Sequence, residues 1–233
     1  MTTTRATTTV LFDLDGTLTD PREGFVASVR HALLQLGRSA PSDSELACHI
    51  GPPLEDTLAL LLGSTNDRGE VEAAVALYRQ RYAAEGILEN CVYPGIPSAL
   101  TKLQALGMSL YVATSKPLVF AERILEHFGL RKFFRVVYGS ELDGTRSNKR
   151  DLIAYILDRE KMSPHSTHMV GDRARDIVGA KANAVRSIGA LWGYGSREEL
   201  TAAGATALCE QPSLLSEVLS FNCALQPIAG SGG

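Results

Sequence analysis

Short apolar runs alternate with helical periodicity along most of the chain. Five runs of three to five residues indicate strands, because they are short, apolar and bounded by polar or glycine positions. They cover residues 10–12, 109–113, 136–138, 168–170 and 185–188. Segments between them carry apolar residues three or four positions apart, the spacing of one helix face. They cover residues 96–106, 118–128, 150–159 and 174–183. The alternation predicts an α/β fold, a Rossmann-like parallel sheet flanked by helices.

The interval between the first two of these strands breaks the rhythm, because its apolar positions follow helical spacing only. Phe25, Val29 and Leu33 form one such stripe. We therefore predict an all-helical insertion after the first strand, with its first helix beginning at Asp20 as N-cap. The resulting divisions are a Rossmann-like core of residues 1–19 and 92–233 and an insertion of residues 20–91. The polar and glycine-rich end, residues 226–233, is expected to be disordered.

Composition excludes several classes of protein. With 233 residues, 45% of them hydrophobic and 21% charged, and a formal net charge of −3, the chain has the make-up of a globular domain with one main core. Its basic residues lack interleaved aromatic side chains, so no nucleic-acid polymer is expected as a partner. No segment is long and apolar enough to cross a membrane, and the polar first nine residues lead us to expect a cytoplasmic protein. The four cysteines lie far apart, without the close spacing of a zinc site or a redox pair, so we expect them to be reduced thiols.

The strongest chemical pattern is the first strand running directly into Asp13-Leu14-Asp15-Gly16-Thr17. Alternation along a strand directs both carboxylates to the same side, and ligands of open parallel sheets bind beyond the carboxyl ends of the strands. Two adjacent carboxylates repel each other unless a cation compensates, and oxygen ligands without histidine suit Mg²⁺. A carboxylate can attack phosphorus while a neighbouring acid protonates the departing oxygen. Asp13 and Asp15 fit those two roles.

A plain strand-ending turn is the alternative for such a pattern. Residues 142–145 repeat the Leu-Asp-Gly-Thr string of residues 14–17, with Glu141 where Asp13 would stand. We interpret this second copy as a turn, so the specificity of the first copy rests on Asp13 and the preceding strand.

Two later strands also end in polar residues. Thr114 and Ser115 follow the strand 109–113, and hydroxyl and N–H groups ahead of a helix can hold an anion, although they also suit an ordinary N-cap. Asp172 and Asp176 follow the strand 168–170 and share a helix face. Their alternative role is to stabilise a helix N-terminus through its dipole.

In this order, the motifs resemble those of the haloacid dehalogenase superfamily. The resemblance implies that Asp13 is the nucleophile, that Asp15 is the acid and base, and that Thr114 binds the transferred phosphoryl group. It implies that Lys149, which opens a helical segment, neutralises Asp13 and the phosphoryl group. Three other cations compete with Lys149 for that assignment. They are Lys116, Arg146 and Arg150.

The resemblance also assigns a metal site and a phosphate site. Mg²⁺ would be held by Asp13, Asp15 and Asp172, with Asp176 supporting it from behind. The phosphate would be bound by residues of the first three motifs. They are Gly16, Thr17, Thr114, Ser115 and Lys149.

Residues 177–183 and 193–196 resemble the phosphoglycolate phosphatase and bacterial 5′-nucleotidase-like branch of the superfamily. In that branch a helical cap is inserted after the first motif and closes over the site, in agreement with the insertion at residues 20–91. Residues 50–54, a rigid turn within the cap, are a candidate substrate-reading loop or a plain connector. Arg22 is a weaker candidate for substrate contact.

The implied function is Mg²⁺-dependent hydrolysis of a small phosphate monoester through an aspartyl-phosphate. A dehalogenase is disfavoured, since a halide leaves without a proton and needs no Asp15. A phosphomutase acting on a sugar phosphate and a noncatalytic phosphate-binding module stay open as alternatives. The expected partner is a small phosphorylated metabolite: phosphoglycolate, a nucleoside monophosphate or a specialised-metabolite phosphate. The sequence gives no indication of oligomeric state.

Overall fold

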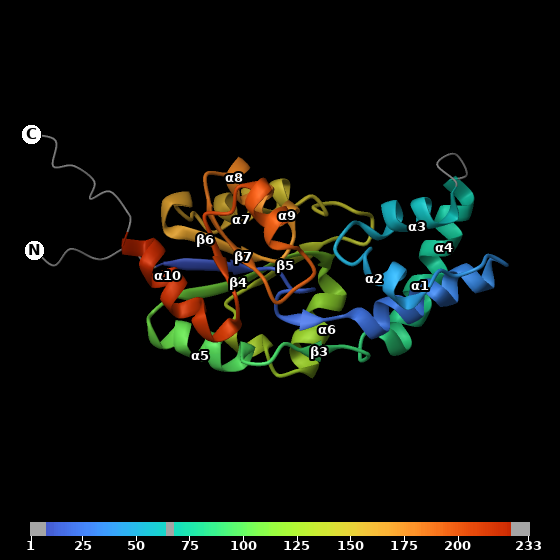
Figure 1. Ribbon diagram of the computed structural model, residues 1–233, viewed down its shortest axis with the longest axis horizontal. Helices are drawn as coiled ribbons and strands as arrows, with labels where there is room; N and C mark the ends of the chain where they lie inside the picture. The colour runs from blue at the N-terminus through green and yellow to red at the C-terminus, as the bar shows by residue number, and fades with distance from the viewer. Residues whose placement is uncertain (1–7, 64–67, 225–233) are drawn as a thin grey trace, which may run out of the picture.

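The structure, a computed structural model, describes residues 8–63 and 68–224, so the expectation for residues 226–233 lies outside the described part. Its centre is a six-stranded, wholly parallel sheet in the order β5-β4-β1-β6-β7-β8 (Figure 1). The strands are β1 (Thr9–Phe12), β4 (Ser109–Pro117), β5 (Val137–Ser140), β6 (Thr167–Gly171), β7 (Arg186–Ala190) and β8 (Ala207–Cys209). The predicted parallel α/β sheet is confirmed.

Helices cover both faces of the sheet. The core helices are α5 (Ile96–Ala105), α6 (Leu118–His127), α7 (Lys149–Arg159), α8 (Ala174–Ala182), α9 (Arg197–Ala203) and α10 (Leu215–Ala224). Three short 3₁₀ turns join them at Arg131–Phe133, Pro164–Ser166 and Pro212–Leu214. Figure 1 shows α7, α8 and α9 on one side of the sheet and α5 and α10 on the other.

The two faces separate because side chains alternate along each strand. In β1, Leu11 packs in a buried cluster with Ile153 and Ile156 of α7. Its neighbour Phe12 belongs to the larger cluster on the opposite face, which includes Leu103 of α5. Burying both faces explains why the strands are continuous apolar runs rather than alternating ones.

The cap helices form a separate group at one end of the molecule (Figure 1). They are α1 (Arg22–Gln35), α2 (Asp43–Ala47), α3 (Leu54–Leu62) and α4 (Arg68–Arg81), followed by a π-helical turn at Tyr82–Gly86. The chain passes from core to cap at β2 (Thr19–Asp20) and returns at β3 (Cys91–Val92), and these two strands pair as an antiparallel ribbon. This ribbon lies at the predicted divisions 19/20 and 91/92, which stay predictions.

The expected N-cap of the first helix was wrong by one position. Pro21 is the N-cap of α1 and makes no side-chain capping bond. Asp20 belongs to the ribbon instead, where its Oδ1 accepts a hydrogen bond from the Arg22 N–H at 3.0 Å. The ribbon explains the shift, since Asp20 pairs with Cys91. Among the described residues, no helix is long and apolar enough to span a membrane.

Candidate active site

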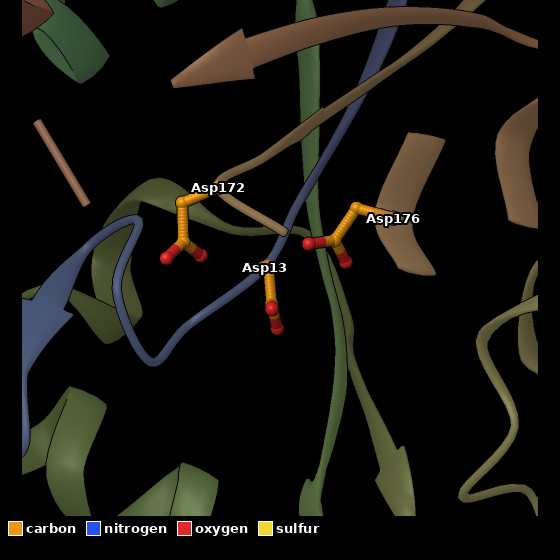
Figure 2. Close-up of side chains that lie close together, drawn as sticks. All are labelled: Asp13, Asp172 and Asp176. Atoms are coloured by element: carbon orange, nitrogen blue, oxygen red, sulfur yellow. The ribbon is translucent and has the colours of Figure 1, made fainter. Parts of the chain in front are cut away.

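Three carboxylates converge at the carboxyl end of the central strands. Asp13 follows β1, Asp172 follows the neighbouring strand β6, and Asp176 lies in the first turn of α8. One oxygen of each lies within 4.8 Å of the others, and Figure 2 shows the three side chains around one small space. Parallel pairing of β1 with β6 brings the two strand ends together, as expected for residues at this edge of a sheet.

Burial makes this group electrostatically unfavourable without a cation. Asp172 and Asp176 are fully buried and Asp13 is 8% exposed. Burial, reinforced by repulsion from Asp176 and Asp13, raises the pKa of Asp172 to about 8. Burial also raises the pKa of Asp176, against the lowering effect of Lys149. Asp172 and Asp176 therefore each favour a proton or a positive charge beside them.

Lys149 supplies one positive charge within the group. Its Nζ lies 3.0 Å from Asp13 Oδ1 and 2.8 Å from Asp176 Oδ1, and it donates a hydrogen bond to the Ala113 carbonyl at 2.8 Å. Burial lowers the pKa of the ammonium, but Asp13 and Asp176 outweigh that effect and the net shift is upward. Lys149 therefore stays charged beside the proposed nucleophile.

The rival cations pair with other groups or are exposed. Arg146 pairs with Glu141, and Arg150 is exposed. Lys116 pairs with Asp15. Of the candidates raised by the sequence, only Lys149 has an ion pair with Asp13 among those formed by the described residues.

Close packing around Asp172 requires glycines, among them Gly16 and Gly193. A Cβ at Gly16, where φ is +84°, would lie 2.2 Å from Asp172 Oδ2, and one at Gly193 would lie 2.3 Å from Asp172 Cβ. The backbone N–H of Tyr194 donates to Asp172 Oδ2 at 2.9 Å, and the Thr17 hydroxyl donates to Oδ1 at 3.2 Å. The loop after β7 thus fixes the orientation of this carboxylate.

Asp15 lies outside the group of three acids. Its carboxylate pairs with Lys116, and burial raises its pKa while Lys116 opposes the rise. Its Oδ1 is buried and has no hydrogen-bond partner among the described residues. The structure thus associates Asp15 with a lysine rather than with Asp172, and its predicted role as a metal ligand stays a prediction.

Thr114 and Ser115 lie within β4, which continues to Pro117 instead of ending at the predicted residue 113. The Thr114 hydroxyl is buried and accepts a hydrogen bond from the Lys116 N–H at 3.2 Å. The Ser115 carbonyl accepts one from the Ser140 hydroxyl at 2.8 Å, and the Ser115 hydroxyl has no partner in the described part of the chain. Both side chains are available to a bound group.

These residues face a cavity of about 110 Å³ between core and cap. The core contributes Asp13, Asp15 and residues 114–117 to its lining, and the cap contributes the predicted loop 50–54 together with a set of aromatic side chains. The aromatic side chains of the cap in this lining are Phe25, Tyr78 and Tyr82. Arg22 lines a different depression, beside Arg30 and Asn90.

A divalent cation fits the acid group. Three buried carboxylates are paired with one ammonium, that of Lys149. The Arg175 guanidinium also interacts with them electrostatically, and negative charge is still in excess. Carboxylate oxygens are the ligands that Mg²⁺ prefers. Asp13 and Asp172 would hold the ion, with Asp176 behind them.

Comparison with known proteins identifies the family. Residues 10–190 match the model described as haloacid dehalogenase-like hydrolase, and the chain belongs to that family. It is 46% identical over 210 residues to a 5′-nucleotidase of Pseudomonas aeruginosa, covering 90% of this chain and 94% of that protein. It is 41% identical over 201 residues to the tyrosine-protein kinase PtkA of Mycobacterium tuberculosis, covering 85% of this chain and 67% of the kinase.

Solved structures agree with this assignment. A predicted phosphatase from Clostridium acetobutylicum matches with a TM-score of 0.85 at 38% identity. The match covers 95% of this chain and 100% of the phosphatase chain. The family resemblance, the capped α/β fold and the predicted enzyme class, a phosphoric monoester hydrolase of this family, are thereby confirmed.

Sequence reasoning missed several residues at the site. Lys116 was only a rival for another position, yet it holds Asp15. Arg173 and Arg175 bind cap carbonyls, those of Ile50 and Gly51. These contacts join segments more than a hundred residues apart, so no local spacing marked them.

Proposed function

We propose that the protein is a Mg²⁺-dependent phosphatase that hydrolyses a small phosphate monoester through an aspartyl-phosphate on Asp13. The observation that supports this most is the position of Asp13, which lines the cavity while its carboxylate contacts Lys149 and adjoins Asp172 and Asp176. A nucleophile that is held by a cation and opens on a cavity suits attack on phosphorus.

The residues divide the reaction between them. Asp13 attacks the phosphorus atom, and the phosphorus–oxygen bond to the leaving group breaks as Asp15 gives its proton to the departing oxygen. Water then attacks the phosphoryl group on Asp13 and gives its proton to Asp15, while the bond between phosphorus and the Asp13 oxygen breaks, releasing inorganic phosphate and the Asp13 carboxylate. Burial raises the pKa of Asp15 against the lowering effect of Lys116, which is the direction that a proton donor needs. Lys149, Thr114 and Ser115 bind the phosphoryl oxygens, and Mg²⁺ supplies further positive charge to them when bound.

The substrate proposal follows the relatives. Because a 46% identical relative is named a 5′-nucleotidase, nucleoside monophosphates are the first substrates to test, with phosphoglycolate and sugar phosphates next. The cap residues that line the cavity would contact the leaving group, as the aromatic side chains of Phe25 and Tyr78 suit.

The test is phosphate release from this panel with Mg²⁺ and with excess chelator, using wild-type protein and Asp13→Asn. We expect release that depends on Mg²⁺ and falls by at least ~10³-fold in Asp13→Asn, since the amide cannot attack. An unchanged melting temperature would show that the variant is folded. Substantial release by pure Asp13→Asn would contradict the proposal, and isomerisation of a sugar phosphate that needs a bisphosphate activator would favour the mutase.

A further inference from the structure

Three buried polar atoms of the cavity lining have no hydrogen-bond partner within the described residues. They are Asp15 Oδ1, Ser115 Oγ and the hydroxyl oxygen of Tyr82. Buried polar groups of native proteins are nearly always paired, so unpaired atoms gathered on one cavity indicate a group that binds there. The first two atoms belong to residues with roles in the proposed reaction. Tyr82 has no such role, and it comes from the cap.

The ring of Tyr82 is held in one place by its neighbours. It is 1% exposed and stacks on Tyr78 with ring centroids 5.3 Å apart and planes inclined by 10°. Phe120 meets it edge-on at 5.6 Å, and the Lys116 ammonium lies 5.0 Å from its centroid. Both the stack and the ammonium fix the ring, so the hydroxyl has a defined position and can discriminate between ligands.

The hydroxyl also lies in the electrostatic field of the proposed acid. The Asp15 charge contributes, after burial, to raising the pKa of Tyr82, and Lys116 connects the two residues by pairing with Asp15 while contacting the Tyr82 ring. A group that receives a proton from Asp15 would therefore be bound near Tyr82. In the proposed reaction, that group is the leaving group.

We propose that Tyr82 determines substrate specificity by hydrogen-bonding a polar group of the leaving group, a hydroxyl or carbonyl beyond the ester oxygen. The substrate class is then a phosphomonoester with a polyhydroxylated or similarly polar leaving group, rather than a bare aryl or alkyl phosphate. This inference rests on the proposed phosphatase activity. Phe25 of the cap and Phe120 of the core add no polar groups to the lining, and the charged cap side chains there, Glu55 and Arg79, pair with each other. The buried Tyr82 hydroxyl has no partner among the described residues, which makes it the natural point of orientation.

The test is Tyr82→Phe, which removes only the hydroxyl and keeps the ring stack. The substrates are phenyl phosphate, which offers no second polar group, and ribose 5-phosphate and a nucleoside 5′-monophosphate, which do. We expect kcat/KM to fall about tenfold for the polar substrates and to stay unchanged for phenyl phosphate, as the loss of one substrate hydrogen bond predicts. Tyr155→Phe is the matched control, because Tyr155 packs on Tyr138 away from the cavity.

Two measurements separate this role from a structural one. The melting temperature of Tyr82→Phe should be equal to or above that of wild type, because the hydroxyl removed is unpaired. An equal fall on all substrates, no fall on any, or a lower melting temperature would overturn the assignment. If wild-type protein hydrolyses none of the substrates, the proposed phosphatase function fails. If wild-type protein is active but Tyr82→Phe does not discriminate between the substrates, only the role of Tyr82 fails.

Discussion

The two sides of the cavity differ in kind. On the core side the lining is charged: Asp13 lines the cavity, its carboxylate pairs with the buried Lys149 at the start of α7, and the buried Asp172 adjoins it. On the cap side the lining is mainly aromatic and aliphatic, with the Tyr78 and Tyr82 rings stacked at its centre. The difference indicates that the core carries the chemistry and that the cap selects the substrate.

The largest effect is expected when the positive charge is removed from the core side, because this tests whether that side carries the chemistry. Lys149→Met leaves Asp13 and Asp176 without their shared partner. We expect kcat to fall on the order of 10³-fold, as when a preorganised charge is lost from a site. The uncompensated acids should also destabilise the fold by about 3–5 kcal/mol, measured by chemical denaturation.

A double variant separates the two effects of Lys149. In Lys149→Met combined with Asp176→Asn, one buried carboxylate disappears with the ammonium, so part of the stability should return while the activity stays lost. Activity that recovers together with stability would show that Lys149 is only structural.

The contact between the two sides offers the second test. Arg173 Nη1 donates to the Ile50 carbonyl at 2.9 Å, and Arg175 donates to the Gly51 carbonyl. Both carbonyls belong to the loop 50–54 that lines the cavity. Each charged hydrogen bond is worth about 1.5–3 kcal/mol, so Arg175→Met should lower kcat/KM by ~10- to 100-fold and speed amide exchange in residues 46–58.

Arg197→Met is the control for this test, since Arg197 pairs with Glu210 in an exposed ion pair within the core. It should leave both kinetics and exchange unchanged. Slow exchange around the loop in Arg175→Met, together with normal kinetics, would show that the contact does not hold the cap in place.

The smallest effect concerns neither side of the cavity. His168 is fully buried in β6, neither ring nitrogen has a partner among the described residues, and burial, with a contribution from Arg186, lowers its pKa to about 4. In the unfolded chain the pKa is about 6.5. The unfolded state therefore takes up the proton first, and stability present above pH 6.5 is lost as pH falls toward 4, by up to about 3 kcal/mol.

Denaturation measured at pH 7 and pH 4.5 would check this loss. In His168→Leu the pH dependence should flatten by that amount, whereas the acid cluster is untouched. An unchanged pH slope in His168→Leu would show that His168 does not cause the loss.

Local patterns predicted the core side well. The strand-to-acid transition at Asp13 and the strand and helix around Asp172 are each encoded within a few residues, and the structure brings these acids together. Lys149, which pairs with Asp13, was distinguished from its rivals only by the motif order of the family that the chain resembles. Parallel strand ends must meet at one edge, so position along each strand was sufficient. The strand β8 was missed because Ala207–Cys209 is short and follows no long apolar run.

The cap side was predictable only as helices. Whether the side chains of Tyr78 and Tyr82 line the cavity depends on how the cap helices pack. In addition, a π-helical turn at Tyr82–Gly86 changes the helical phase there. The pairing of Lys116 with Asp15 joins residues separated by 101 positions. Tertiary contacts of this kind leave no periodicity in the sequence.

The most direct test of the central claim is to look for the covalent intermediate. Wild-type protein turning over a good substrate with Mg²⁺ would be quenched rapidly in acid, digested and analysed by mass spectrometry. The account predicts one phosphoryl group on the peptide that contains Asp13, located at Asp13 itself and missing in Asp13→Asn. Turnover with an unmodified Asp13, or with the phosphoryl group on another residue, would contradict it.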